Sequence, residues 1–210
     1  MSVEVEAEPA VAAQIFGTQI EVARRFASNL AQFGEERGLI GPLEPPRLWS
    51  RHILNCGVFA DLLSPGHLVG DVGSGAGLPG LVLALARPDV EFALIEPMER
   101  RTDWLSEQVA DLGLTNVHVV RSRVQDAPFI EKCDVVTARA VSALKTLIPM
   151  TAPLVKPGGS LLLMKGASVD REIEDAKKQI RAHRLVDLRV IYSGEGILDE
   201  PTRLVQATVE

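Results

Sequence analysis

Apolar residues follow two different spacings, and the change near residue 64 divides the chain into two parts. In the first part they recur with a helical period, and Gly38, Gly41 and Pro42 end the first of two predicted helices. The second helix is predicted over residues 48–63. We therefore expect a helical extension over residues 1–64 and a separate domain over residues 65–210. The apolar stripe of the first helix comprises Ile15, Ile20, Val22, Phe26, Leu30 and Phe33.

From residue 67 onward, short apolar runs alternate with segments of helical period. This alternation is typical of a mainly parallel sheet with right-handed crossovers and helices on both faces. The last two apolar runs are joined by too few residues for a crossover, so we expect an antiparallel hairpin there. The predicted fold class is α/β and Rossmann-like, with a seven-stranded, mainly parallel sheet whose last strand is antiparallel. Strands are expected over residues 67–72, 91–96, 117–121, 133–138, 160–165, 185–192 and 203–209, and helices over residues 78–87, 98–112, 140–154 and 169–184.

The composition is that of an ordinary globular protein. Of the 210 residues, 46% are hydrophobic and 24% are charged, and a chain of this length folds without a disulfide or a metal. Cys56 and Cys133 lie far apart without ligand-like spacing, which predicts a reducing compartment and no metal site. The acidic start does not resemble a secretion signal, and no apolar run approaches the ~20 residues of a membrane helix, so we expect a soluble, cytoplasmic protein. The net charge of −6 argues against a nucleic-acid surface spread over the whole molecule, but it permits a local basic patch.

The strongest local signal is a glycine-rich turn between the first strand and the first helix of the second part. Gly73, Gly75 and Gly77 let the backbone turn tightly and approach a ligand closely. With Gly80 the run matches the GxGxxG dinucleotide fingerprint, and with Asp71 it also matches motif I of class I methyltransferases. A carboxylate disfavours a pyrophosphate and favours the cationic ammonium and sulfonium groups of S-adenosylmethionine (SAM). We therefore expect Asp71 and these glycines to form a SAM site.

A second carboxylate, Glu96, ends the second predicted strand, 19 residues after Gly77. A carboxylate in that position accepts hydrogen bonds from ribose hydroxyls, so it predicts a nucleoside ligand. It does not separate SAM from NAD, because both carry a ribose. A dehydrogenase would also need a substrate domain, and the sequence offers no second domain of that size.

Basic residues follow several of the predicted strands. Because ligands of an open α/β sheet lie outside the carboxyl ends of its strands, Arg123, Arg139 and Lys165 are expected on one rim. Arg51 and His52 join them from the preceding helix. Any one of these residues is equally compatible with an ordinary surface position, but together they predict a local positive site. Four other basic residues are expected on solvated helix faces: Arg100, Arg101, Lys177 and Lys178.

Five short segments match one methyltransferase family in chain order. They are residues 51–54 (RHIL), 71–80 (DVGSGAGLPG), 122–124 (SRV), 139–140 (RA) and 165–166 (KG). On these segments the chain resembles the small-subunit ribosomal RNA methyltransferase G family, also called RsmG or GidB. The glycine motif by itself indicates only a class I methyltransferase, whereas the ordered set is specific to the family.

The resemblance implies a class I methyltransferase fold, SAM as cofactor, and methylation of a guanine N7 in the 530 loop of 16S ribosomal RNA. The implied partner is the 30S subunit or an assembly intermediate, and we expect a monomer. The implied cofactor contacts are Gly73, Leu78, Val124, Gln125 and Arg139. The chain departs from the family at Ser74, Ala76, Asn55–Cys56 and Glu96, where Thr, Pro, Asp-Ser and Asp are more usual.

Methyl transfer to guanine N7 needs no general base, because that nitrogen already carries a lone pair. Catalysis then consists of positioning and electrostatics, and we expect Arg139, Arg123 and Lys165 to supply it. Arg51, His52, Arg123 and Lys165 are the predicted RNA contacts, and the target base has to be unstacked or already exposed. No metal is expected.

Three other functions are compatible with the sequence. A class I methyltransferase acting on another RNA, a small molecule or a protein would share the cofactor motif. An NAD-dependent oxidoreductase would bind NAD and not S-adenosylhomocysteine. A non-catalytic RNA-binding or assembly factor would keep the fold and transfer no methyl group.

Overall fold

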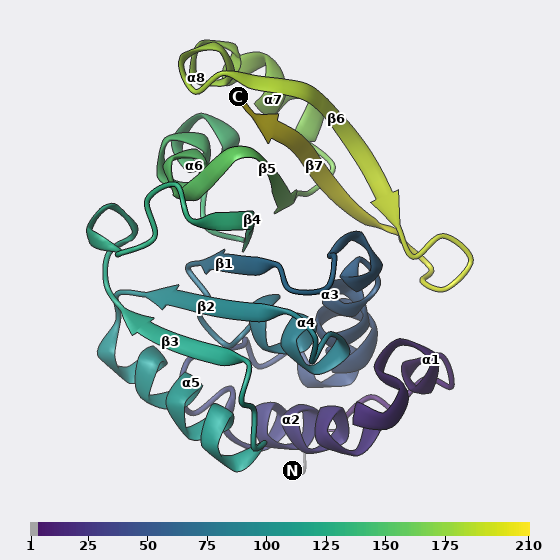
Figure 1. Ribbon diagram of the computed structural model, residues 1–210. Helices are drawn as coiled ribbons and strands as arrows, with labels where there is room; N and C mark the ends of the chain where they lie inside the picture. Colours follow the sequence, from purple (N-terminus) through teal and green to yellow (C-terminus); the bar gives the residue numbers. More distant parts are fainter. Residues whose placement is uncertain (1–3) are drawn as a thin grey trace.

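Seven strands form one sheet in the computed structural model, which describes residues 4–210 (Figure 1). The spatial order is β3-β2-β1-β4-β5-β7-β6. Strands β1 to β5 run parallel, and β7 pairs antiparallel with both β5 and β6. The predicted seven-stranded sheet with an antiparallel last strand is confirmed. The strands are β1 (Leu68–Val72), β2 (Glu91–Glu96), β3 (Val117–Arg121), β4 (Cys133–Arg139), β5 (Val155–Met164), β6 (Leu185–Ser193) and β7 (Thr202–Val209).

Apolar side chains project from both faces of the sheet and contribute to two hydrophobic clusters. In β2, Phe92 and Leu94 belong to one cluster and Ile95 to the other, and in β5 Leu162 and Leu163 divide in the same way. This is the two-residue alternation of a strand, with both faces apolar. Both faces therefore have to be covered by helices.

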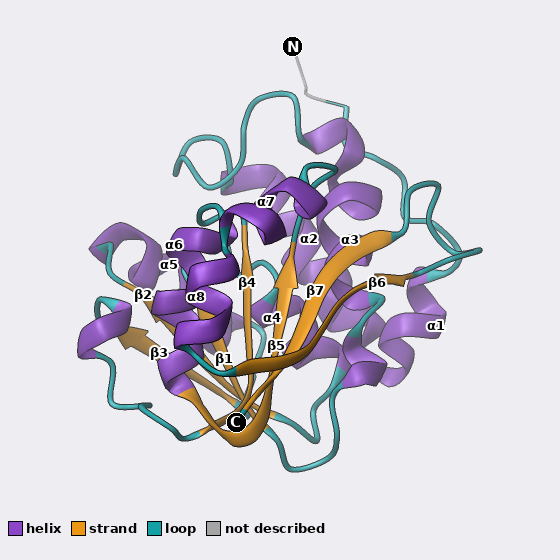
Figure 2. Cartoon of the chain, turned by 90° about the horizontal axis from the view of Figure 1, so that it is seen from above, coloured by secondary structure: helices purple, strands orange, loops and turns teal. Residues whose placement is uncertain are grey.

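Helices pack on both faces, as Figure 2 shows from above. Helices α2, α4 and α5 contribute to the first cluster, while α6 and α7 contribute to the second. The helices are α1 (Ala12–Phe16), α2 (Ile20–Phe33), α3 (Asn55–Gly57), α4 (Gly80–Ala86), α5 (Glu99–Asp111), α6 (Leu144–Thr151), α7 (Val169–Asp175) and α8 (Lys177–Ala182).

Two segments predicted as continuous helices are interrupted. Residues 48–63 form a π-helical turn (Trp49–Leu54), then α3, then a 3-10 turn (Ala60–Leu62). Residues 169–184 divide into α7 and α8. A π turn holds more residues than an α turn, which an apolar period averaged over a window does not register, and such turns are frequent at functional sites.

The N-terminal segment packs on the α4 side of the sheet. Phe26 and Leu30 of α2 are fully buried in the same cluster as Leu81 and Leu83 of α4. The division of the chain at residue 64 stays a prediction. Within residues 4–210, no helix is long and apolar enough to cross a membrane.

Candidate active site

Two adjoining cavities lie at the carboxyl ends of the parallel strands. The smaller pocket, of about 340 Å³, lies beyond β1, β2, β3 and β4. The larger pocket, of about 640 Å³, lies beyond β4 and β5 and reaches the β6–β7 loop. Arg139 and Ala140, at the end of β4, line both cavities and form the wall between them. Both volumes are typical of small-molecule sites.

The glycine turn forms one side of the smaller pocket. Gly73 has a φ of +72°, which is accessible to glycine and strained for other residues. A Cβ at this position would lie only 2.8 Å from Cγ2 of Val141, which also lines the pocket. Glycine is therefore required here both by the backbone and by the space.

Glu96 lies where the sequence predicts a ribose-binding carboxylate, at the end of β2 and in the pocket wall. It is 1% exposed. One carboxylate oxygen accepts a hydrogen bond from the Gly75 amide at 3.1 Å, and the other accepts one from the Met98 amide at 3.0 Å. Each oxygen keeps a second lone pair for a ligand hydroxyl. Glu96 therefore ties the glycine turn to the start of α5 while facing the cavity.

Asp71 lies behind the turn and does not line the pocket. Its side chain is fully buried, and Oδ2 accepts a hydrogen bond from the Gly80 amide at 3.1 Å, at the start of α4. Burial raises the pKa of Asp71 to about 7. Asp71 therefore supports the glycine turn from below, and its predicted part in the SAM site, directly or through water, stays a prediction. The predicted site residues Gly75, Gly77 and Leu78 likewise shape the turn without lining the cavity.

The buried Asp71 carboxyl gives folding a specific pH dependence. A carboxyl with a raised pKa keeps its proton in the folded protein after the unfolded chain has released it, so its contribution to stability is complete below pH 3.8 and is lost as the pH rises through 7. Asp71→Asn removes this titration. We expect the difference in the free energy of unfolding, Asp71→Asn minus wild type, to be roughly 2 kcal/mol more positive at pH 8 than at pH 5. Urea denaturation at the two pH values measures it. Asp89→Asn is the control, because Asp89 is exposed and Arg87 lowers its pKa. If the difference in unfolding free energy between Asp71→Asn and the wild type is the same at pH 5 and pH 8, the prediction is wrong.

Three predicted residues after β3 lie at the smaller pocket: Arg123, Val124 and Gln125. Val124 is buried and contributes to an apolar wall, whereas Arg123 and Gln125 are exposed. In the part of the chain that the structure describes, the Arg123 side chain makes no ion pair or hydrogen bond with another side chain. Its charge is therefore free to meet an anionic ligand.

Arg101, expected from the sequence on a solvated helix face, is a further residue of the smaller pocket. Arg101 lies in the first turn of α5 and lines the smaller pocket, with Nη1 3.7 Å from Glu96 Oε2. Its separation of five residues from Glu96 was the available signal, since the start of a helix after a strand stays at the same sheet edge. The pocket wall also contains Val72, Ile95, Pro97, Met98, Val141 and Met150.

The larger pocket combines cations, carboxylates and an aromatic ring. Arg203 packs over the ring of Tyr192, with 5.4 Å between the guanidinium carbon and the ring centroid. Asp199 and Glu200 line the same cavity from the β6–β7 loop, and Arg51 lines it from the π-helical turn. β6 ends at Ser193 and β7 begins at Thr202, so each strand is one residue longer at the loop than predicted and the loop comprises residues 194–201.

Both ends of this loop are fastened to the helical segment before β1. Ser193 Oγ donates to the carbonyl of Val58 at 2.5 Å, and Thr202 Oγ1 donates to the carbonyl of Asn55 at 2.7 Å. Hydrogen bonds thus connect the side of the larger pocket formed by the β6–β7 loop to the side formed by the helical segment before β1.

Lys165 lies in the wall of the larger pocket and is already paired. Its Nζ lies 2.7 Å from Glu172 Oε2 and donates to the carbonyl of Ser142 at 2.9 Å, with the side chain 9% exposed. In this arrangement Lys165 fastens the turn after β4 to α7. Lys165 thus lies at the predicted rim, where its charge is paired with Glu172, and its predicted contact with RNA stays a prediction.

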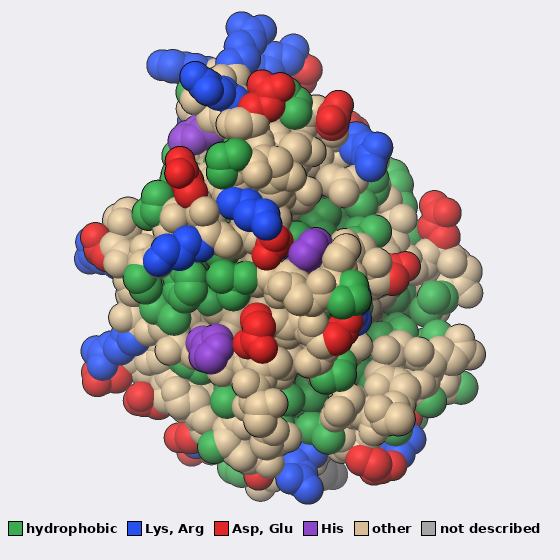
Figure 3. Space-filling model, in the orientation of Figure 1, with side chains coloured by type: hydrophobic (Ala, Val, Ile, Leu, Met, Phe, Trp, Pro, Cys, Tyr) green, Lys and Arg blue, Asp and Glu red, His purple; other side chains and the backbone are tan. Residues whose placement is uncertain are grey.

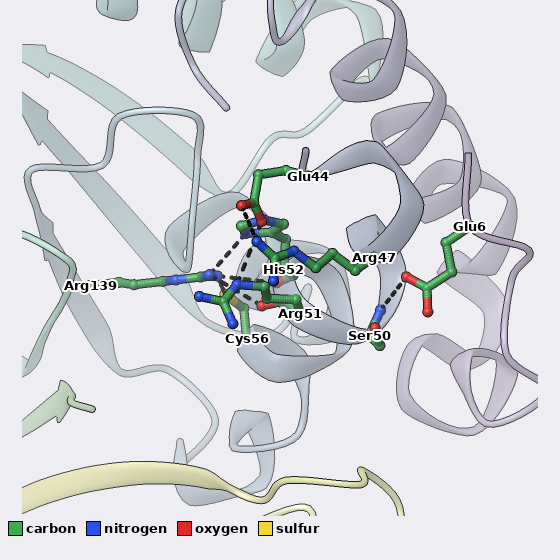
Figure 4. Close-up of polar contacts among 8 residues, drawn as sticks. All are labelled: Glu6, Glu44, Arg47, Ser50, Arg51, His52, Cys56 and Arg139. Atoms are coloured by element: carbon green, nitrogen blue, oxygen red, sulfur yellow. Dashed lines mark hydrogen bonds and ion pairs between the residues drawn. The ribbon is translucent and has the colours of Figure 1, made fainter. Parts of the chain in front are cut away.

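Arg139 crosses from the end of β4 to the π-helical turn, as Figure 4 shows. Nη2 donates to His52 Nδ1 at 2.8 Å and to the Arg51 carbonyl at 3.1 Å, while Nη1 donates to Cys56 Sγ at 3.1 Å. His52 is 8% exposed, and its Nε2 lies 2.6 Å from Glu44 Oε2. The predicted RNA contact by His52 is not available here, because the ring is buried and both nitrogens are engaged.

Burial lowers the pKa of His52 to about 4, and the adjacent Arg139 guanidinium lowers it as well. The imidazole is therefore neutral near pH 7. A neutral imidazole has one donor and one acceptor nitrogen, so accepting from Arg139 at Nδ1 fixes Nε2–H as the donor to Glu44.

Comparison with known proteins agrees with this geometry. The family described as "GidB: rRNA small subunit methyltransferase G" matches residues 19–200. A ribosomal RNA small subunit methyltransferase G from Leifsonia xyli subsp. xyli (strain CTCB07) is 62% identical over 209 residues, covering 100% of both chains. One from Arthrobacter sp. (strain FB24) is 54% identical, covering 97% of this chain and 94% of the relative.

Solved structures share the fold at low sequence identity. M. jannaschii TYW2 in complex with AdoMet superimposes with a TM-score of 0.60 at 19% identity, covering 76% of each chain. The S-adenosylmethionine-dependent methyltransferase SibL in its apo form gives a TM-score of 0.63 at 18% identity, covering 95% of this chain and 71% of that one. The fold is that of class I SAM-dependent methyltransferases, and the chain belongs to the rRNA small subunit methyltransferase G (GidB) family.

Proposed function

We propose that this protein transfers the methyl group of SAM to N7 of a guanine in the 530 loop of 16S ribosomal RNA. The observation that carries the proposal is the pair of pockets that share Arg139 and Ala140 as lining residues. A methyl donor and an acceptor base need two such sites in contact, because transfer is a direct displacement between them. Full-length relatives with 62% identity bear the name ribosomal RNA small subunit methyltransferase G.

The smaller pocket fits SAM by its own chemistry. Its apolar wall, including Ile95, Val124 and Met150, suits an adenine ring, and Glu96 would hold the ribose hydroxyls. The side-chain-free Gly73 would admit the amino-acid end, with Arg139 available to its carboxylate. When bound, SAM supplies an electrophilic methyl group on a cationic sulfur.

The larger pocket suits the acceptor guanine. Tyr192 offers an aromatic surface for a base taken out of its stack. A guanine becomes cationic as N7 is methylated, so the carboxylates of Asp199 and Glu200 would stabilise the product charge. No side chain has to remove a proton from N7. The chain's contribution is to hold the base, orient it and compensate charge.

RNA phosphates need cations outside the pockets as well. Arg123 is exposed at the mouth of the smaller pocket. Figure 3 shows a second gathering of Lys and Arg side chains over α8, at the top of the molecule. Lys177, Lys178 and Arg181 of α8 are exposed, as is the following Arg184. These local patches would let a protein of net charge −6 meet a large RNA.

The substrate is expected to be the 30S subunit or an assembly intermediate, met in the cytoplasm by a monomer of this protein. The test is incubation with labelled SAM and 30S particles that lack the modification, followed by mapping of the labelled base. Label at N7 of one guanine in the 530 loop is the expected result. Naked 16S RNA, tested in parallel, decides which form is the substrate, and absence of label from both disproves the proposal.

Arg123→Ala tests the RNA contact at the pocket mouth. Losing one phosphate contact raises KM for the particle by about tenfold and makes its salt dependence shallower, with affinity for S-adenosylhomocysteine little changed. Arg121→Ala is the matched control, because Arg121 is also exposed but is paired with Glu99 at 2.5 Å. Equal KM values for the two variants in steady-state assays would show that Arg123 does not touch the RNA.

A further inference from the structure

A chain of three side chains links the wall between the two pockets to the loop that follows α2. Figure 4 shows Arg139 extending to His52, with Glu44 on the far side of the ring. The contacts are 2.8 Å from Arg139 Nη2 to His52 Nδ1 and 2.6 Å from His52 Nε2 to Glu44 Oε2. Glu44 is itself held at its other oxygen by Arg47 at 2.6 Å. We call this the Glu44–His52–Arg139 relay.

Every hydrogen bond in the relay has a fixed direction. A guanidinium only donates, so His52 Nδ1 accepts, and the ring then donates from Nε2 to the carboxylate. A protonated ring would donate from both nitrogens and would face Arg139 with like charge. The relay is complete only with a neutral imidazole, which the buried position favours.

The positive charge of Arg139 is not neutralised by an ion pair and can act on ligands in the two pockets. Within residues 4–210, no carboxylate lies within ion-pair distance of its guanidinium, and its partners are the ring of His52, the thiol of Cys56 and two backbone carbonyls. Glu44 compensates the charge only through the imidazole. A direct ion pair with an acid would instead neutralise the cation, whereas these neutral partners leave its positive charge uncompensated.

We propose that Glu44 and His52 are positioning residues that hold the Arg139 guanidinium in the wall shared by the two pockets. The inference rests on the proposed function and adds to it the two residues that hold the Arg139 guanidinium, which lines both pockets. Both positioning residues lie outside the cavities, so they act through Arg139 and do not touch donor or acceptor. Arg139 is placed to touch either ligand.

Kinetics separate positioning from general support of the helical turn. We expect Glu44→Ala and His52→Ala to lower the single-turnover rate of methyl transfer at saturating SAM and 30S particles by about 10- to 100-fold. In an Arg139→Ala background the same changes should cause no further loss, because the group they position is gone. Glu44→Gln keeps an oxygen acceptor for His52 and should retain most of the rate.

Glu6→Ala is the matched control. Glu6 Oε2 accepts a hydrogen bond from the Ser50 amide at 3.0 Å, so this carboxylate also supports the π-helical turn but has no link to Arg139 (Figure 4). It should leave the rate unchanged. If Glu44→Ala fails to fold in a thermal melt, His52→Asn replaces it, because Asn offers Arg139 an acceptor but cannot reach Glu44.

The relay is also tested without methyl transfer, by ¹⁵N NMR of histidine-labelled protein. The spectrum of His52 should be that of a neutral Nε2–H ring at pH 6, and Arg139→Ala should shift its Nδ1 resonance and raise its pKa. A His52 that is cationic at pH 6, or a spectrum unchanged by Arg139→Ala, overturns the proposal. So do additive rate losses in the Arg139→Ala background, or a Glu6→Ala loss as large as that of Glu44→Ala. If the wild-type protein transfers no labelled methyl group to RNA, the proposed function is wrong. The NMR experiment still shows whether the Glu44–His52–Arg139 relay exists.

Discussion

Arg139→Ala is expected to lower kcat/KM for methyl transfer by about 100-fold or more, because among residues 4–210 it removes the one cation that lines both pockets. The guanidinium is held by the π-helical turn, and its loss also frees the Arg51 carbonyl and the Cys56 thiol that it binds. The effect should appear in single-turnover rates with 30S particles. Arg139→Lys keeps the charge without the planar fork and should fall between wild type and Ala.

A surface arginine provides the control for Arg139. Arg189 on β6 is exposed, and its Nε donates to Gln206 on the neighbouring strand at 2.9 Å, away from both pockets. Arg189→Ala should leave the rate unchanged. A folded Arg139→Ala protein that transfers methyl groups at half the wild-type rate or faster would remove Arg139 from the site.

Gly73→Ala is expected to weaken binding of S-adenosylhomocysteine by about 10- to 100-fold. The added methyl group meets Val141 at 2.8 Å, and both residues line the smaller pocket, so relief of the clash moves the pocket wall. The positive φ adds a strain of about 1 kcal/mol to the folded state, which lowers stability but not affinity. Calorimetric titration of the folded variant measures the affinity directly.

Gly113→Ala isolates the backbone strain. Gly113 also has a positive φ, +65°, but a Cβ there has nothing within 4 Å. This variant should lose stability and bind S-adenosylhomocysteine as tightly as the wild type. If Gly73→Ala binds equally well, the glycine turn does not form the cofactor site.

The strands and the glycine turn were predictable because each depends on a local rule. Residues 91–96 and 117–121 were placed with their observed bounds, since short apolar runs between polar or turn-forming residues are typical of strands in a sheet covered on both faces. The turn was found because several closely spaced glycines signal positive φ, which the structure shows at Gly73, Gly75 and Gly77.

The side-chain arrangement of the site was less predictable, because it depends on contacts between distant segments. Asp71 belongs to the motif, yet only the fold shows that its carboxylate turns under α4. His52 was expected at an RNA surface, and its burial depends on Glu44 and on Arg139, which is 87 residues away in the chain. Sequence proximity contains no information on such pairing, so Arg123 and Arg139 were found at the pockets, whereas Arg101 and the partners of His52 were not.

Strand β7 occupies the place between β5 and β6, and this order has a consequence for synthesis. While the chain is still being translated, β5 presents an unpaired edge until Thr202–Val209 has left the exit tunnel. The Asn55 carbonyl also lacks its Thr202 partner until then. A nascent chain that has completed every other strand therefore still lacks the part of the larger pocket that Thr202 and Arg203 line.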